Sequence, residues 1–144
     1  MGGERYYTFE PDAPPLAEVL RTRVRFFMLD SENLDRTQIA WLDSELGKSD
    51  ATWNIPIFHR PIYTSGRYAS PARFLRAALE PVFVKHGVRV ALSGHEHFYE
   101  RTHPQQGITY FVSGAAGSLR VGDIRPTAIT AQGLLRLGTY LTAK

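Results

Sequence analysis

The chain has 144 residues, 43% of them hydrophobic and 22% charged, which is the composition of one globular domain. It contains no cysteine, and this excludes disulfides, thiolate metal ligands and cysteine nucleophiles. The formal charge of +3 is spread without a basic run, and no apolar stretch approaches the roughly 18–20 residues of a membrane span, so we expect neither a nucleic-acid nor a membrane partner.

The N-terminal third predicts two strands and one helix. Residues 5–9 have the aromatic and β-branched character of a strand, and residues 23–29 pass from an alternating to a wholly apolar pattern, which is typical of a strand that becomes buried. Asp35 begins the clearest helix, because Gln38 follows it in a capping-box arrangement. Gly47 is a plausible terminator of this helix.

The middle of the chain predicts a strand followed by a second helix. Residues 53–58 form the strand, in which Pro56 indicates an edge position or an irregularity. The helix begins at Ser70, with proline in the favoured first position. We expect Pro81 to kink or restart it, and a glycine ends it after residues 85–86.

Two more strands complete an α/β pattern. Residues 88–93 form a short apolar strand, and residues 108–113 form another that runs into a glycine-rich turn over 114–117. Strands that alternate with helices are typical of an α/β layer. Residues 120–144 give no convincing pattern, so we assign no element there.

Three histidines follow predicted strands. His59 ends the strand over 53–58, and His95 and His97 come just after the strand over 88–93. Ligand sites in open α/β sheets gather at the carboxyl ends of strands. Residues two apart on an extended segment point to the same side, so two such imidazoles can reach one metal ion or two neighbouring ions. Two solvated loop histidines are the alternative interpretation.

The other two histidines favour structural roles. His86 lies in a helix-terminal turn, where a histidine interacts well with the helix dipole. His103 precedes a proline in a polar loop. We therefore predict metal ligation only for His59, His95 and His97.

The segments Ile57-Phe-His-Arg-Pro-Ile-Tyr63 and Ser93-Gly-His-Glu-His-Phe-Tyr-Glu-Arg101 resemble calcineurin-like metallophosphoesterases, the purple acid phosphatase branch in particular. That branch is similar in three places: a strand ending in His-x-Pro-x-Tyr, a Gly-His-x-His-x-Tyr-Glu-Arg segment, and a following Ser-Gly-x-x-Gly turn, here Ser113 to Gly117. Order and spacing agree from about residue 23 to residue 118. The resemblance is to the C-terminal half of the family domain.

The resemblance implies an αββα sandwich with two metal ions, iron with zinc or manganese, at its strand ends. It implies His59 and His95 on one ion and His97 on the other. It also implies hydrolysis of a phosphate-ester substrate by water activated at those ions. The fold class we expect is therefore α/β, half of such a sandwich, with residues 1–144 as a single partial domain.

The family's other ligands come from an N-terminal half with Asp, Gly-Asp-x-x-Tyr and Gly-Asn-His-Glu motifs, and this chain shows none of them. The branch's histidine acid is also missing, since the segment after Tyr63 reads Ser65-Gly-Arg-Tyr68. The catalytic residues are thus unknown. Three nitrogens cannot close a two-ion site, so we expect at most one weakly bound ion. Arg60, at a strand end, is a better candidate for contacting phosphate than Arg101, for which we expect a structural ion pair with the preceding Glu100.

Two functions remain open at this point: a metal-dependent phosphoesterase that is incomplete in this chain, or a catalytically inactive metal- or phosphate-binding module or degenerate fragment. We expect self-association or a complementing N-terminal half as partner. Residues 1–5 show no secretory signal core. Many relatives are secreted and a mature secreted chain would also lack the signal, so localisation stays open.

Overall fold

A computed structural model describes residues 5–12, 22–115, 120 and 123–134. It has the expected α/β fold, with seven strands in one mixed sheet and two helices. The elements are β1 (Tyr7–Phe9), β2 (Val24–Leu29), α2 (Arg36–Lys48), β3 (Trp53–Phe58), α3 (Ala69–Lys85), β4 (Val90–Ser93), β5 (Tyr99–Thr102), β6 (Thr109–Ser113) and β7 (Thr130–Leu134). The strands and helices predicted from the pattern are all present.

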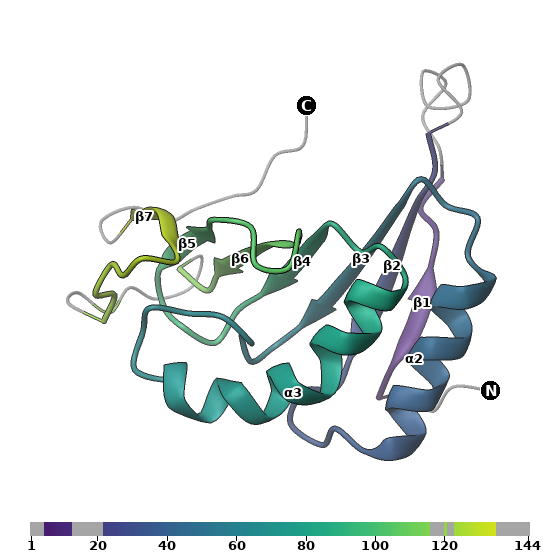
Figure 1. The fold of residues 1–144 in the computed structure, drawn as a ribbon, viewed down its shortest axis with the longest axis horizontal. Coiled ribbons are helices and arrows are strands. Elements are labelled where there is room, and N and C mark those ends of the chain that lie inside the picture. The colour runs from purple at the N-terminus through teal and green to yellow at the C-terminus, as the bar shows by residue number, and fades with distance from the viewer. Residues whose placement is uncertain (1–4, 13–21, 116–119, 121–122, 135–144) are drawn as a thin grey trace.

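The sheet has the order β1-β2-β3-β4-β6-β5-β7 (Figure 1). Its centre, β2-β3-β4-β6, is parallel, and β1 and β5 pair antiparallel to their neighbours β2 and β6. The carboxyl ends of the central strands therefore meet at one edge of the sheet. This is the edge at which the predicted ligands follow their strands.

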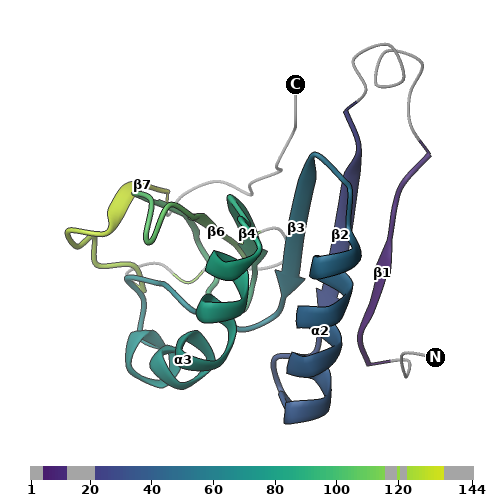
Figure 2. The same cartoon turned by 45° about the vertical axis from the view of Figure 1, so that its right-hand side comes forward.

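Both helices lie on the same face of the sheet (Figures 1 and 2). Apolar side chains from this face pack with those of α2 and α3 in one buried cluster, which holds the helices on the sheet. The fully buried members include Phe27, Leu42, Leu79 and Phe83. Truncating any one of them to alanine is expected to cost about 2–5 kcal/mol.

The opposite face of the sheet is also apolar. Because side chains alternate along a strand, the neighbours of the buried residues point away from the helices. Within the described ranges no helix or second sheet covers this face. We call it the open face; its register-matched members are Tyr7, Phe9, Phe26, Met28, Ile55, Ile57, Leu92 and Phe111.

The capping of α2 agrees with the sequence in part, and its end does not. The Asp35 side chain accepts a hydrogen bond from the Gln38 backbone nitrogen at 2.8 Å, which is one half of the predicted capping box. The other half is not formed, because the Gln38 side chain bonds to the backbone of Asp30 instead of returning to Asp35. The prediction that Gly47 terminates the helix was wrong, because α2 continues to Lys48. Ser49 ends it in an extended conformation and donates its backbone N–H to the Leu46 carbonyl.

The two interior prolines lie within continuous elements, and Pro81 does not restart its helix. Pro81 lies inside α3, which continues as one helix to Lys85 and is followed by Gly87 at a φ of 65°. Pro56 lies in β3, which is interior to the sheet and not at its edge. The pairing of β3 with β4 starts only at Ile57, so the missing N–H of Pro56 does not break that ladder.

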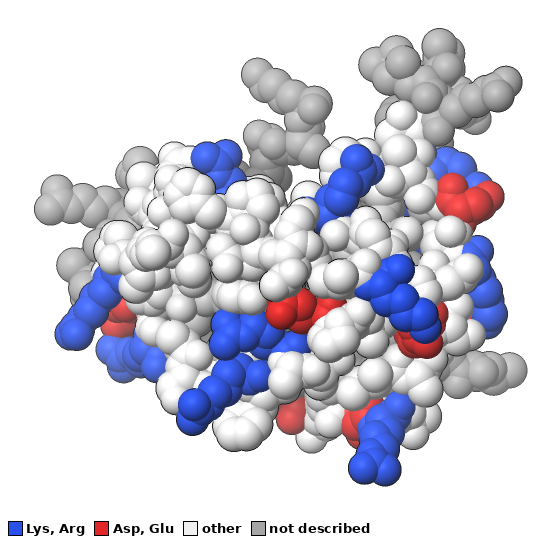
Figure 3. All heavy atoms as spheres, viewed as in Figure 1, with Lys and Arg blue, Asp and Glu red and all other residues white. Residues whose placement is uncertain are grey.

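The surface of the molecule mixes charges of both signs. Figure 3 shows Lys and Arg interspersed with Asp and Glu over one face. Ion pairs account for part of this pattern, such as Lys85–Asp43 at 2.7 Å between α3 and α2. Neither α2 nor α3 has the length and apolar character needed to cross a membrane.

Candidate metal centre

The sheet brings the segments that carry the predicted ligands together. His59 directly follows β3, and His95 and His97 lie in the connection from β4 to β5. The last residues of β3 and β4, Phe58 and Ser93, are register partners. The Gly94 N–H also donates to the His59 carbonyl at 3.0 Å, so the two connections are joined just beyond the strands.

His59 and His95 form a close imidazole pair. His59 Nε2 lies 2.9 Å from His95 Nδ1, so one ring donates a hydrogen bond to the other. The rings meet edge to face, with centroids 4.8 Å apart. Two nitrogens that bind one zinc ion at about 2.0–2.1 Å are separated by at most about 4.2 Å. The 2.9 Å separation lies within this limit, so His59 Nε2 and His95 Nδ1 would be able to hold a single transition-metal ion.

His95 is fixed by its backbone and by a second ring. Its φ of 66° lies in the left-handed region that non-glycine residues rarely adopt. The Tyr68 ring packs against it, with centroids 4.2 Å apart. Burial, together with the neighbouring His59 and Arg60, lowers the pKa of His95, which favours the neutral imidazole that binds metals. Its Nε2 is buried without a hydrogen-bond partner.

His97 is placed separately from this pair. Its Nδ1 is also buried without a hydrogen-bond partner. Among the residues that the structure describes, no three His, Asp or Glu side chains form a group that could hold one ion. The structure thus brings together two of the three predicted ligands, and the assignment of all three to metal stays a prediction.

Glu96, between His95 and His97, is a buried carboxylate that anchors the loop before α3. It accepts a hydrogen bond from the Tyr68 backbone nitrogen at 3.0 Å and lies 3.5 Å from the Thr64 hydroxyl. Burial raises its pKa. The loop approaches so closely that a Cβ at Gly66 would lie 2.2 Å from Glu96 Oε1. Glu96 thereby helps to place the Tyr68 ring on His95.

The end of β6 passes beneath the same segment. A Cβ at Gly114 would lie 2.2 Å from the Glu96 carbonyl oxygen, so only glycine fits there without a backbone shift. This contact explains the glycine that follows Ser113 in the predicted turn. Gly117, the other glycine of that turn, lies outside the described residues.

Glu100 connects β7 with the loop after β3. Its buried carboxylate accepts hydrogen bonds from the Ser65 backbone nitrogen at 2.8 Å and from the Thr130 hydroxyl at 2.7 Å. Thr130 is the first residue of β7, and Ser65 belongs to the loop that Glu96 anchors. The prediction that Arg101 pairs with Glu100 finds no support, since Arg101 is exposed and these donors occupy the carboxylate.

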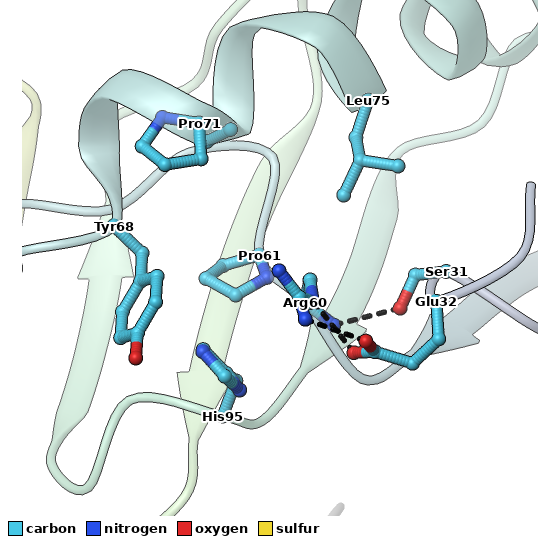
Figure 4. Close-up of a pocket in the computed structure, with 9 residues that line it drawn as sticks. Ser31, Glu32, Arg60, Pro61, Tyr68, Pro71, Leu75 and His95 are labelled. Atoms are coloured by element: carbon cyan, nitrogen blue, oxygen red, sulfur yellow. Dashed lines mark hydrogen bonds and ion pairs between the residues drawn. The ribbon is translucent and has the colours of Figure 1, made fainter.

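Arg60 is held beside the imidazole pair by an ion pair. Its Nε and Nη2 donate to the two carboxylate oxygens of Glu32, each at 2.6 Å. Its backbone nitrogen donates to the Ser31 hydroxyl at 2.8 Å. Arg60 and His95 line one pocket with Tyr68, and Figure 4 shows these side chains around it. Arg60 is near the site, as predicted, with part of its donor capacity taken by Glu32.

Four residues of the site were missed by the sequence reasoning. Tyr68 was noted only as lying where the branch has histidines, and Glu96 only as the variable residue of a motif. Glu100 looked like the partner of Arg101, and Glu32 fitted no motif. A buried carboxylate whose partners are distant in sequence gives no local pattern. The one available signal was an aromatic residue at the end of the otherwise polar run 64–68, and it points to Tyr68.

The comparison with protein families identifies the class. The calcineurin-like phosphoesterase profile matches residues 4–99, which include His59, His95 and His97. The match covers more than half of the chain. The chain therefore belongs to the calcineurin-like phosphoesterase family, in agreement with the resemblance seen in the motifs.

Curated relatives are acid phosphatases. Acid phosphatase from Aspergillus ficuum is 43% identical over 67 residues, which cover 44% of this chain and 11% of that protein. Purple acid phosphatase 1 from Ipomoea batatas is 33% identical over 97 residues, covering 65% and 20%. Acid phosphatase type 7 from Homo sapiens is 36% identical over 99 residues, covering 58% and 23%. The chain thus spans less than a quarter of the length of these relatives.

Solved structures share the fold. Purple acid phosphatase PPD1 from yellow lupin superposes with a TM-score of 0.71 at 21% identity, covering 90% of this chain and 26% of that one. GAP50, described as the anchor in the inner membrane complex of Plasmodium, gives a TM-score of 0.73 at 20% identity, covering 92% and 44%. At these identities the likeness concerns the fold alone.

Proposed function

We propose that this chain supplies the histidine side of a metal-dependent phosphoesterase centre, and that the completed centre hydrolyses phosphate esters. The observation that carries the proposal is the His59–His95 pair, 2.9 Å apart, at the ends of two adjacent parallel strands. Two unpartnered buried nitrogens, His95 Nε2 and His97 Nδ1, support further ligation at the same edge.

In this proposal His59 and His95 hold one ion and His97 contributes to a second. Iron with zinc or manganese is the metal pair that the purple acid phosphatase relatives suggest. Bound ions of this kind neutralise phosphate oxygens and lower the pKa of water toward about 7. The chain's own residues orient the site: Tyr68 packs on His95, and Glu96 holds the loop that carries Tyr68.

The described residues offer no carboxylate that bridges two ions, so we expect this chain alone to hydrolyse 4-nitrophenyl phosphate no faster than the background rate with zinc, iron or manganese. Adding a segment with the missing Asp and Asn motifs is expected to produce turnover. His97→Ala should abolish that turnover, and the matched control His103→Ala, in an exposed loop, should retain it. Turnover that survives His95→Ala and His97→Ala would contradict the proposal.

A catalytically inactive metal- or phosphate-binding module is the second candidate. One observation favours it: the described residues do not form a three-ligand group for any single ion. GAP50 also carries this fold and is described as an anchor. Under this alternative, metal would bind through His59 and His95, and no complementing segment would yield turnover. The complementation experiment separates the two functions.

A further inference from the structure

A pocket of about 210 Å³ opens beside His95. Its lining comes from four parts of the chain: the residues after β2, the residues after β3, the start of α3, and His95 in the connection after β4. The ion pair of Arg60 with Glu32 forms one side of the pocket, and the Tyr68 ring lies across from it (Figure 4). The pocket therefore adjoins the proposed metal site directly.

The two ends of the pocket differ in chemistry. His95 and the Tyr68 hydroxyl lie at one end, and Leu75 and Pro71 of α3 lie at the other (Figure 4). Ala72 adds apolar surface beside them and is buried. A ligand whose polar group contacts His95 thus places its other, non-polar part against Leu75 and Pro71.

The volume of the pocket and the charges around it restrict the part of the ligand that lies against Leu75 and Pro71. A cavity of about 150 Å³ lined by apolar side chains accepts benzene, so this pocket has room for a ring or a short branched alkyl group. Two of the Arg60 nitrogens, Nε and Nη2, are bonded to Glu32, so this carboxylate balances the guanidinium charge. The Glu32 carboxylate would repel a second anionic group on the ligand.

We propose that this pocket binds the alcohol part of the phosphate ester and selects esters whose alcohol part is neutral and apolar, aromatic rings included. Leu75 is the main specificity residue and Tyr68 aligns the ester beside His95. The inference rests on the proposed function, because it places the phosphate group at the histidine pair.

Binding of two phosphonates tests the inference without turnover. The ¹⁵N-labelled chain with equimolar zinc is titrated with phenylphosphonate and with methylphosphonate, and dissociation constants are taken from amide shifts. Phenylphosphonate should bind about tenfold more tightly, since one apolar group in a fitting pocket is worth at least that factor. Leu75→Gln, of similar size, should bring the two affinities within about twofold of each other.

Two variants control for folding and for nonspecific apolar contact. Leu75→Met keeps an apolar side chain of similar volume and should keep the preference. Phe74→Ala removes a larger apolar side chain that is 75% exposed on the same helix and does not line the pocket, and it should keep the preference as well. Equal wild-type affinities for the two phosphonates would overturn this inference alone. Absence of binding by both would overturn the inference together with the proposed function.

Discussion

The imidazole of His95 is held from three directions. His59 meets its Nδ1 at 2.9 Å, Tyr68 packs on its ring, and its backbone occupies the left-handed region at a φ of 66°. Backbone strain of this kind costs about 1–3 kcal/mol and persists only where the surroundings impose it. At this position the left-handed backbone accompanies a side chain that points toward His59, with the two nitrogens within hydrogen-bond distance.

Removal of one nitrogen should therefore remove most of the metal affinity. We predict that the wild-type chain binds about one zinc ion weakly, and that His95→Ala weakens this binding at least about tenfold. Calorimetric titration with zinc, and metal analysis after dialysis, measure the effect. His103→Ala is the matched control and should bind zinc as the wild type does. Equal zinc content in wild type and His95→Ala would contradict this prediction.

Gly114 constrains the placement of the segment that carries His95 and His97. Alanine there would put a Cβ 2.2 Å from the backbone oxygen of Glu96, which cannot yield as a flexible side chain would. We predict that Gly114→Ala lowers the free energy of unfolding by about 1–3 kcal/mol and also weakens zinc binding. Urea denaturation measures the first effect.

The matched control for this variant is Gly47→Ala. Its new Cβ would meet His86 Cε1 at 3.4 Å, an ordinary contact distance, and alanine is favoured over glycine in a helix by about 0.5–1 kcal/mol. Gly47→Ala should leave stability unchanged or raise it. If both variants were equally stable, the close approach at Gly114 would not constrain the site.

The placement of His59 and His95 at one edge of the sheet was predictable because the signal is local. Strand patterns end directly before His59 and two residues before His95, and the edge of a parallel sheet is where such residues meet. Glu96 and Glu100 were not predictable as buried groups. Their partners, among them Tyr68 and Thr130, lie about 30 residues away in the chain. Only the folded sheet brings these partners within hydrogen-bond distance.

At the scale of elements, α2 and α3 are connected by one carboxylate. Asp43 of α2 accepts from Lys85 Nζ at 2.7 Å and lies 2.7 Å from His86 Nε2. Lys85 is in the last turn of α3 and His86 is its C-cap. His86 is thus structural, as the sequence predicted. The sequence indicated only an interaction with the end of its own helix, whereas the structure adds a contact with Asp43 of the other helix.

The contacts of Asp43 with Lys85 and His86 should make the free energy of unfolding smaller at acidic pH. Hydrogen bonds from Lys85, and then from His86, lower the pKa of Asp43. A carboxylate with a lowered pKa stabilises the fold above its ordinary pKa of about 3.9, and this contribution is lost as pH falls through the folded value. Asp43→Asn should therefore be less stable than wild type near about pH 6, and the difference should shrink near about pH 3.

Urea denaturation of both proteins across this range provides the measurement. Asp12→Asn, at an exposed position before β2, serves as the control and should follow the wild-type curve at every pH. A constant difference between wild type and Asp43→Asn from neutral to acidic pH would show that the ionised carboxylate contributes nothing through Lys85 and His86.

Elements with a strong periodic pattern were predictable, and two strands without one were not. In β5 the buried residues are Glu100 and Thr102. Because both are polar, the sequence lacks the alternation of apolar and polar residues that would indicate a half-buried strand. β7 contains Gly133 and is largely exposed, and within the described sheet β5 is the one strand that pairs with it. Both strands depend on hydrogen bonds between distant segments, which no local pattern reveals.

At the scale of the whole molecule, the two faces of the sheet are unequally covered. The helices cover one face, and the open face extends from β1 to β6 as a continuous apolar surface of register-matched side chains. Tyr7 and Phe9, at its outer strand, are 50% and 43% exposed. The chain covers only 26% of the lupin phosphatase with which it shares the fold. A second layer on the open face would complete the expected sandwich.

We predict that the isolated chain associates with itself through this open face, because large exposed apolar surfaces rarely persist in monomers. A double substitution of the two most exposed members, Tyr7→Lys with Phe9→Lys, should weaken association at least about tenfold by placing charge in the contact. Phe74→Lys is the matched control: Phe74 is 75% exposed but lies on α3, on the helix-covered side, so the same change there should leave association intact.

Sedimentation velocity over a range of concentrations distinguishes these outcomes. A compact wild-type monomer at every concentration would refute the prediction, and equal weakening by Phe74→Lys would show that the contact involves the helices instead of the open face.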